Sequence, residues 1–173
     1  EMTDMMHLKA IEIISKWLRK SVEGDMKARE EMALGQYIAG MGFSNVGLGI
    51  DHSMAHPLSA FYDIPHGVAC AILLAPVLTF NAEATGERYR EVARAMGVAG
   101  VDDMSQEEYR KAAIDACQKL ADDVGIPRKL SDLGVQEKDI DFLADSAMAD
   151  ACTPGNPRDV EKSQIVALYK SIL

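Results

Sequence analysis

The chain has 173 residues, an apolar fraction of 48% and a formal net charge of −9, which is the composition of a soluble globular domain that buries a core without disulfides or metals. The negative charge argues against nucleic acid and anionic membranes as partners, because both are polyanionic and the sequence has no compensating basic patch. The three cysteines, Cys70, Cys117 and Cys152, are odd in number and widely spaced, so they predict reduced thiols in a cytoplasmic protein.

The hydrophobic pattern is helical from the N-terminus onward. Apolar residues between residues 8 and 22 recur at intervals of three and four, and polar residues stand between them, which predicts an amphipathic helix. A second helix is expected after Gly24, with Asp25 as its N-cap. The longest apolar run, residues 68–78, is shorter than the roughly 20 residues that span a bilayer, and it contains Pro76. It therefore predicts a buried helix over 68–80.

The second half of the chain continues the helical pattern. Further helices are centred on Tyr89, Ile114, Leu143 and Val166, and glycine or proline separates them. Asn156 followed by Pro157 predicts the N-cap and the first residue of the last helix. Because no segment alternates apolar and polar residues as a strand would, we expect an all-α bundle of about eight helices.

Three of the four histidines lie within fifteen residues, in the segment DHSMAHPLSAFYDIPHG. His52 and His56 are four residues apart, so on a helix both rings project from one face and can converge on one metal ion. His66, expected in a loop between Pro65 and Gly67, can fold back toward that face. Asp51 and Asp63 are nearby candidate carboxylate ligands. The alternative is that these are ordinary polar histidines, and spacing alone leaves both interpretations open.

The segment GQYIAGMGFSNVGLGIDHSMAHPLSAFYDIPHGVACAILLAP and the later CTPGNPR resemble the iron-containing (group III) alcohol dehydrogenase family, most closely its lactaldehyde reductase (propanediol oxidoreductase) branch. The resemblance covers the family's C-terminal, iron-binding helical domain, which belongs to the dehydroquinate synthase-like fold. It implies that residues 1–173 form this domain. It also implies that the nucleotide-binding half of such an enzyme is absent from this chain.

The resemblance assigns roles to five residues. His52 and His66 match two ligands of the catalytic Fe²⁺, for which Zn²⁺ or another divalent metal can substitute in the isolated protein. His56 matches a histidine near the nicotinamide that is not an obligatory ligand and is a candidate proton relay. Phe43 and Cys152 match positions that line the substrate pocket. The family's other two ligands, an aspartate and a histidine, lie upstream of the matching region.

Two further residues, His7 and Asp51, receive no catalytic role. His7 does not match the missing ligand's motif and is expected to be structural, and Asp51 stands where relatives carry an apolar residue. The family implies a cytoplasmic, homodimeric, NAD-dependent enzyme that reduces small aldehydes to alcohols, with the metal polarising the carbonyl oxygen. We expect the 173-residue chain alone to be inactive. The alternative function is a stand-alone helical module that binds a metal or a protein partner without catalysis.

Overall fold

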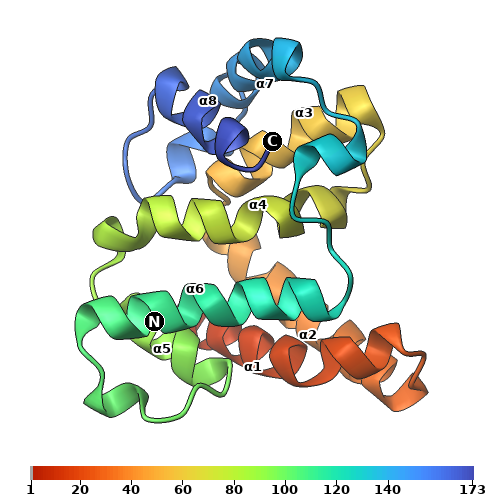
Figure 1. The fold of residues 1–173 in the computed structure, drawn as a ribbon. Helices are drawn as coiled ribbons and strands as arrows, with labels where there is room; N and C mark the ends of the chain where they lie inside the picture. Colours follow the sequence, from red (N-terminus) through yellow and green to blue (C-terminus); the bar gives the residue numbers. More distant parts are fainter. Residues whose placement is uncertain (1) are drawn as a thin grey trace. The chain divides into compact units, whose positions relative to one another are not determined.

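The computed structural model describes residues 2–173, and all regular secondary structure in that range is helical. The eight α-helices confirm the predicted all-α fold (Figure 1). They are α1 (Met2–Val22), α2 (Met26–Val46), α3 (Ile50–Tyr62), α4 (His66–Asn81), α5 (Arg88–Ala95), α6 (Gln106–Asp123), α7 (Ile140–Met148) and α8 (Lys162–Ser171). Five short 3₁₀ turns connect them: η1 (Ala82–Thr85), η2 (Val101–Asp103), η3 (Leu130–Leu133), η4 (Glu137–Asp139) and η5 (Thr153–Gly155).

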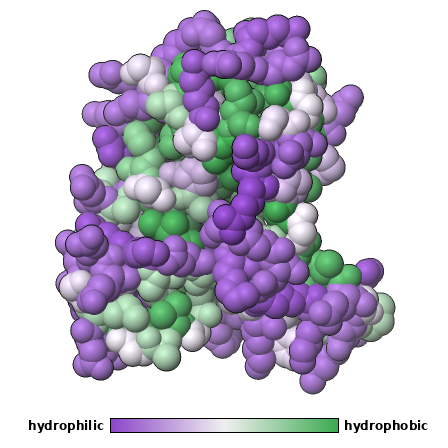
Figure 2. All heavy atoms as spheres, viewed as in Figure 1, coloured by the Kyte–Doolittle hydropathy of each residue, from purple (hydrophilic) through white to green (hydrophobic). Residues whose placement is uncertain are grey.

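The helices form two compact units. Unit 1 comprises Glu1–Gly47 and Thr85–Val124 and contains α1, α2, α5 and α6. Unit 2 comprises Leu48–Ala84 and Gly125–Leu173 and contains α3, α4, α7 and α8. On the face drawn in Figure 2, hydrophilic side chains cover much of the surface and apolar side chains appear in separate patches. Such a mixed surface is ordinary for a folded helical protein.

In unit 1, small residues allow α1 and α2 to pack closely. A Cβ atom added to Gly35 would lie 2.9 Å from Ile13, and one added to Gly42 would lie 2.5 Å from Nε2 of His7. His7 therefore packs against the neighbouring helix, in keeping with the structural role expected for it. The side chain of Asp25 accepts a hydrogen bond from the Ala28 amide at 2.9 Å, so its predicted role as N-cap of α2 is confirmed.

Unit 2 has a core of fully buried side chains from all four of its helices. Met54 and Leu58 of α3, Leu73 of α4, Leu143 of α7 and Tyr169 of α8 are each 0% exposed. Burial of each such apolar side chain stabilises the fold by about 1.5–3 kcal/mol relative to exposure. The Tyr169 hydroxyl donates to the Met54 carbonyl at 2.6 Å, which joins α8 to α3 inside the core. This packing holds the helix that carries two of the histidines.

The apolar helix α4 contains the predicted helix over 68–80 and extends it by two residues at the N-terminal end and one at the C-terminal end. Together α4 and η1 form a helical stretch of 20 residues, His66–Thr85, that is long and apolar enough to cross a membrane by length and composition alone. The expectation that this segment is too short was therefore wrong, because the helical stretch extends beyond the apolar run 68–78 at both ends. However, Ala69, Leu73 and Val77 lie in the core of unit 2, and the core helix of a soluble protein passes the same test.

The predicted start of the last helix was also wrong. Helix α8 begins at Lys162, where Glu161 forms a capping box with Gln164. Asn156 instead exchanges two hydrogen bonds of 2.9 Å with Asn81 at the end of α4. Its side chain is thus used by a tertiary contact, which the local Asn-Pro signal does not reveal.

Candidate metal centre

Helices α3 and α4 place the three histidines together. Helix α3 begins at Ile50, so His52 and His56 lie one turn apart on it, as the spacing predicted. The helix ends at Tyr62, and the left-handed conformation of its C-cap residue Asp63 (φ 53°) turns the chain. Helix α4 then begins at His66, with Pro65 as its N-cap residue. His66 is therefore the first residue of a helix, and its predicted place in a loop was wrong by a small margin.

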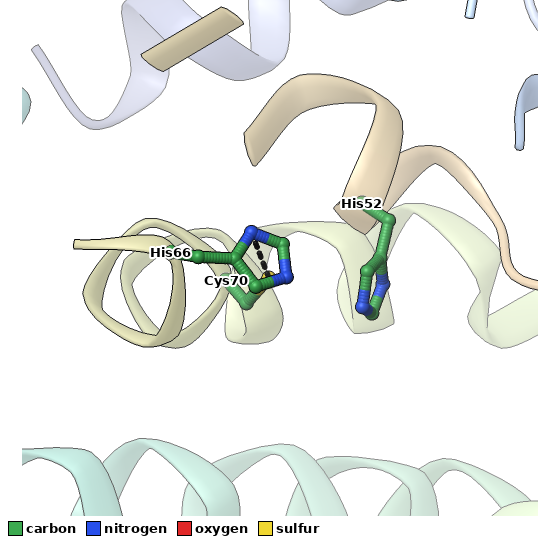
Figure 3. A group of neighbouring side chains, drawn as sticks. All are labelled: His52, His66 and Cys70. Carbon is green, nitrogen blue, oxygen red and sulfur yellow. Dashed lines mark hydrogen bonds between the residues drawn. The ribbon is translucent and has the colours of Figure 1, made fainter. Parts of the chain in front are cut away.

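The three imidazole rings are mutual neighbours. The ring centroids are 5.4 Å apart for His52 and His66, 5.6 Å for His56 and His66, and 6.1 Å for His52 and His56. His52 and His66 face each other from α3 and α4 (Figure 3). Spacing alone left two interpretations open, a shared metal site or three separate polar side chains. The structure brings the three rings together, which favours a shared site.

Cys70 joins the two candidate ligands, and sequence reasoning had given it no role. One ligand atom from each of His52, His66 and Cys70 lies within 4.8 Å of the others. The Cys70 Sγ lies 3.6 Å from Nε2 of His66, one turn earlier on α4 (Figure 3). Imidazole and sulfur ligands at such separations suit a divalent transition metal. In the sequence, the signal for this role was that Cys70 lies four residues after His66, which is about one helical turn.

The electrostatics around this group favour uncharged side chains. Burial lowers the pKa of His52, and His66 and His56 lower it further, so the neutral imidazole needed for metal binding is favoured. Burial raises the pKa of the Cys70 thiol to about 12, and the neighbouring Asp51 adds to this effect. Burial also raises the pKa of Asp51 to about 7, against the hydrogen bond from Cys70. Cys70 is thus a protonated thiol at neutral pH, not a free thiolate.

A second group lies beside the first and contains His56, Asp150 and Cys152. Oδ2 of Asp150 lies 2.7 Å from Nδ1 of His56, and Oδ1 accepts from the Cys152 amide at 2.8 Å. Burial raises the pKa of Asp150, but the hydrogen bonds from His56 and Cys152 outweigh it, and the net pKa lies below the ordinary value. Asp150 is therefore ionised at neutral pH. Sequence reasoning missed it, because it lies 94 residues from its partner.

For four other predicted positions, the structure gives the location but does not test the role. Cys152 is half-buried beside Asp150, next to the candidate proton relay. Phe43 lies on α2 in unit 1 with 40% of its surface exposed. The pocket-lining roles of these two residues stay predictions. Asp63 is exposed and belongs to neither group of ligand atoms, whereas Asp51 has an oxygen 4.0 Å from Nδ1 of His52.

The chain is similar to known proteins over nearly its whole length. The family model described as "Fe-containing alcohol dehydrogenase family, C-terminal" matches residues 1–173. Lactaldehyde reductase of Escherichia coli (strain K12) is 60% identical over 168 residues, which are 97% of this chain and 44% of that protein. The chain thus spans less than half the length of this relative.

Two solved structures of alcohol dehydrogenases or oxidoreductases share the fold of this chain. A crystal structure of a 1,3-propanediol oxidoreductase superposes with a TM-score of 0.95 at 38% identity, over 99% of this chain and 45% of that one. An alcohol dehydrogenase from Oenococcus oeni has a TM-score of 0.95 at 37% identity, over 100% of this chain and 45% of that one.

Proposed function

This chain belongs to the Fe-containing alcohol dehydrogenase family, and from this premise we propose that residues 1–173 are the iron-binding helical domain of an NAD-dependent reductase of small aldehydes such as lactaldehyde. The observation that carries the proposal is the triangle of His52, His56 and His66, with ring centroids 5.4–6.1 Å apart. The 60% identity to a lactaldehyde reductase supports the choice of substrate.

In this proposal, His52 and His66 hold a divalent iron. Their donor chemistry fits, since neutral imidazoles bind Fe²⁺ and the local environment lowers the pKa of His52. When bound, the iron supplies Lewis acidity that polarises a carbonyl oxygen. The remaining protein ligands, an aspartate and a histidine in the family, are proposed to come from outside these 173 residues. Zn²⁺ or another divalent metal can occupy such a site during isolation.

His56 is proposed to handle the proton. The reaction adds a hydride from reduced nicotinamide to the carbonyl carbon and a proton to the carbonyl oxygen. The His56 side chain is 42% exposed and lies beside both candidate ligands. It can therefore supply the proton and recover it from solvent. Phe43 and Cys152 are proposed to contact the substrate.

The proposed oligomeric state, compartment and partners of the enzyme are based on the family and on the composition. The enzyme is a homodimer in the cytoplasm whose partners are small aldehydes and alcohols. All three cysteines are free thiols in the structure, which supports a reducing compartment. The net charge of −9 supports the absence of nucleic acid or an anionic membrane among its partners.

The test is turnover by the complete gene product loaded with Fe²⁺. We expect oxidation of NADH with lactaldehyde as acceptor, and loss of both bound iron and turnover in His52→Ala and His66→Ala. His7 is half-buried against α2 and belongs to neither group of candidate ligand atoms, so its replacement by Gln is expected to leave iron content unchanged. Absence of turnover with one iron bound per chain would contradict the proposed activity.

The 173-residue chain itself tests the alternative of a stand-alone metal-binding module. Because it provides only two of the proposed iron ligands, we expect it to show no dehydrogenase activity and low metal content by elemental analysis. Tightly held metal in this chain, bound through His52, His66 and Cys70, would favour the module.

A further inference from the structure

We propose that Asp150 is a positioning residue for His56. It holds the proton of the neutral ring on Nδ1 and so makes Nε2 the nitrogen that exchanges a proton with the substrate. The inference rests on the proposed function for its catalytic meaning, because the exchanged proton is the one added to the carbonyl oxygen. The tautomer itself is a property of the chain that can be measured without turnover.

The hydrogen bonds of the Asp150 carboxylate carry the proposal. Its Oδ1 accepts from the Cys152 amide at 2.8 Å, and its Oδ2 faces Nδ1 of His56 at 2.7 Å. An ionised carboxylate has no proton to donate, so a hydrogen bond of this length requires the proton to be on Nδ1. The turn at Cys152 keeps the carboxylate in place, because it ties the second oxygen to the backbone. The neutral His56 ring is then left with a lone pair on Nε2.

Stability alone is a weak explanation for this contact. The His56 and Asp150 side chains are 42% and 19% exposed, and contacts between such partly exposed groups typically contribute little to stability. The contact joins α3 to the segment after α7, residues far apart in the chain. It does so at the ring that adjoins both candidate metal ligands, with centroids 5.6 and 6.1 Å away. The contact therefore matters more for the orientation of the His56 ring than for the stability of the fold.

The proton balance is complete with this tautomer. In the direction of aldehyde reduction, hydride from reduced nicotinamide forms the new C–H bond, and the C=O π pair moves to oxygen. That oxygen takes the Nε2 proton of the His56 imidazolium, whose positive charge Asp150 stabilises until the transfer. The ring returns to its neutral Nδ1–H form, and solvent restores the Nε2 proton. In alcohol oxidation, Nε2 accepts the hydroxyl proton and all steps reverse.

The decisive variant is Asp150→Asn in the complete gene product. Its amide oxygen can still accept from the Cys152 amide, so the turn is kept, but its NH₂ group now faces Nδ1 of His56. A donor in that position favours the opposite tautomer, with the proton on Nε2. The matched control is Asp145→Asn on α7, since Asp145 is 61% exposed and pairs with Lys162 at 2.8 Å.

The first readout is the ¹⁵N NMR spectrum of histidine-labelled, Zn²⁺-loaded protein at a pH where the rings are neutral. His56→Gln identifies the signals of this ring. We expect Nδ1 to be the protonated nitrogen in the wild type and in Asp145→Asn, and Nε2 in Asp150→Asn. A wild-type ring with its proton on Nε2 would overturn the proposal, and this result does not depend on whether the variant folds or whether the enzyme is active.

The second readout is steady-state reduction of lactaldehyde by the Fe²⁺ enzyme. We expect kcat of Asp150→Asn to fall roughly 10- to 100-fold, by analogy with metal-ligating histidines that lose an orienting partner. KM and iron content should change little, and the solvent deuterium isotope effect should rise because proton transfer becomes slower. An unchanged kcat and isotope effect would overturn the catalytic part of the inference. If the wild type itself does not reduce lactaldehyde, the proposed function fails, while the tautomer is still decided by NMR.

Discussion

Substitution of Gly155 by Ala should destabilise unit 2 strongly, because this glycine lies against the backbone. A Cβ atom added to Gly155 would lie 2.0 Å from the carbonyl oxygen and 3.2 Å from the carbonyl carbon of Leu48. Real Cβ atoms essentially never lie closer than 3.0 Å to such neighbours, so the two segments must separate by about 1 Å. The obstructing atoms are backbone atoms, and a change of side-chain rotamer cannot relieve the clash.

The magnitude follows from the cost of overpacking. Added carbon atoms in a closely packed place typically cost about 1–3 kcal/mol, occasionally more. We expect the upper end, about 3 kcal/mol, because the shift also disturbs the contact between Gly49 and Asn156, where a Cβ would lie only 3.3 Å from the Asn156 Oδ1. For a chain of this length, such a loss lowers the unfolding midpoint by about 6–12 °C.

The assay is thermal and urea unfolding of the 173-residue chain, followed by circular dichroism. Gly67→Ala is the control, since no atom lies within 4 Å of a Cβ at that helical position. It should leave the free energy of unfolding within about 1 kcal/mol of the wild type, or raise it slightly. Equal stability of the two variants would show that the close approach at Gly155 does not exist in solution, and would refute the reasoning.

Three further outcomes are expected. Tyr169→Phe should lower the free energy of unfolding by about 1 kcal/mol in urea titrations, because a buried hydrogen bond to the Met54 carbonyl of α3 is lost. The control Tyr37→Phe, at a position 62% exposed, should have little effect. Chelation should remove the metal from the complete gene product with loss of turnover, and Fe²⁺ should restore both in the wild type but not in His66→Ala. Hydrogen bonds with Ser105 lower the pKa of Glu108 in the folded state, so its contribution to stability is present above the ordinary carboxyl pKa and is lost as pH falls through the folded value. Glu108→Gln should therefore reduce the loss of stability on acidification, as measured by unfolding midpoints from neutral to acidic pH.

The sequence by itself determined the helical class of the protein and part of its site. The three-to-four-residue period of apolar side chains predicted the helices, because one buried face per helix is enough to order them. The spacing of His52 and His56 set both rings on one face, since it equals about one helical turn. The resemblance to a known family then distinguished the roles of the histidines. These features are local, and a linear pattern records them directly.

Only the tertiary structure decided which distant residues meet. Asp150 reaches His56 across 94 positions, and no period or spacing encodes that pairing. Asn156 carried a helix-start signal, yet its side chain bonds Asn81 instead, because a tertiary hydrogen bond competes with a local cap. Cys70 is a candidate ligand because the packing of α4 against α3 places it near His52. Sequence patterns therefore predicted the helices and the imidazoles, while the packing of unit 2 determined which distant side chains contact those imidazoles.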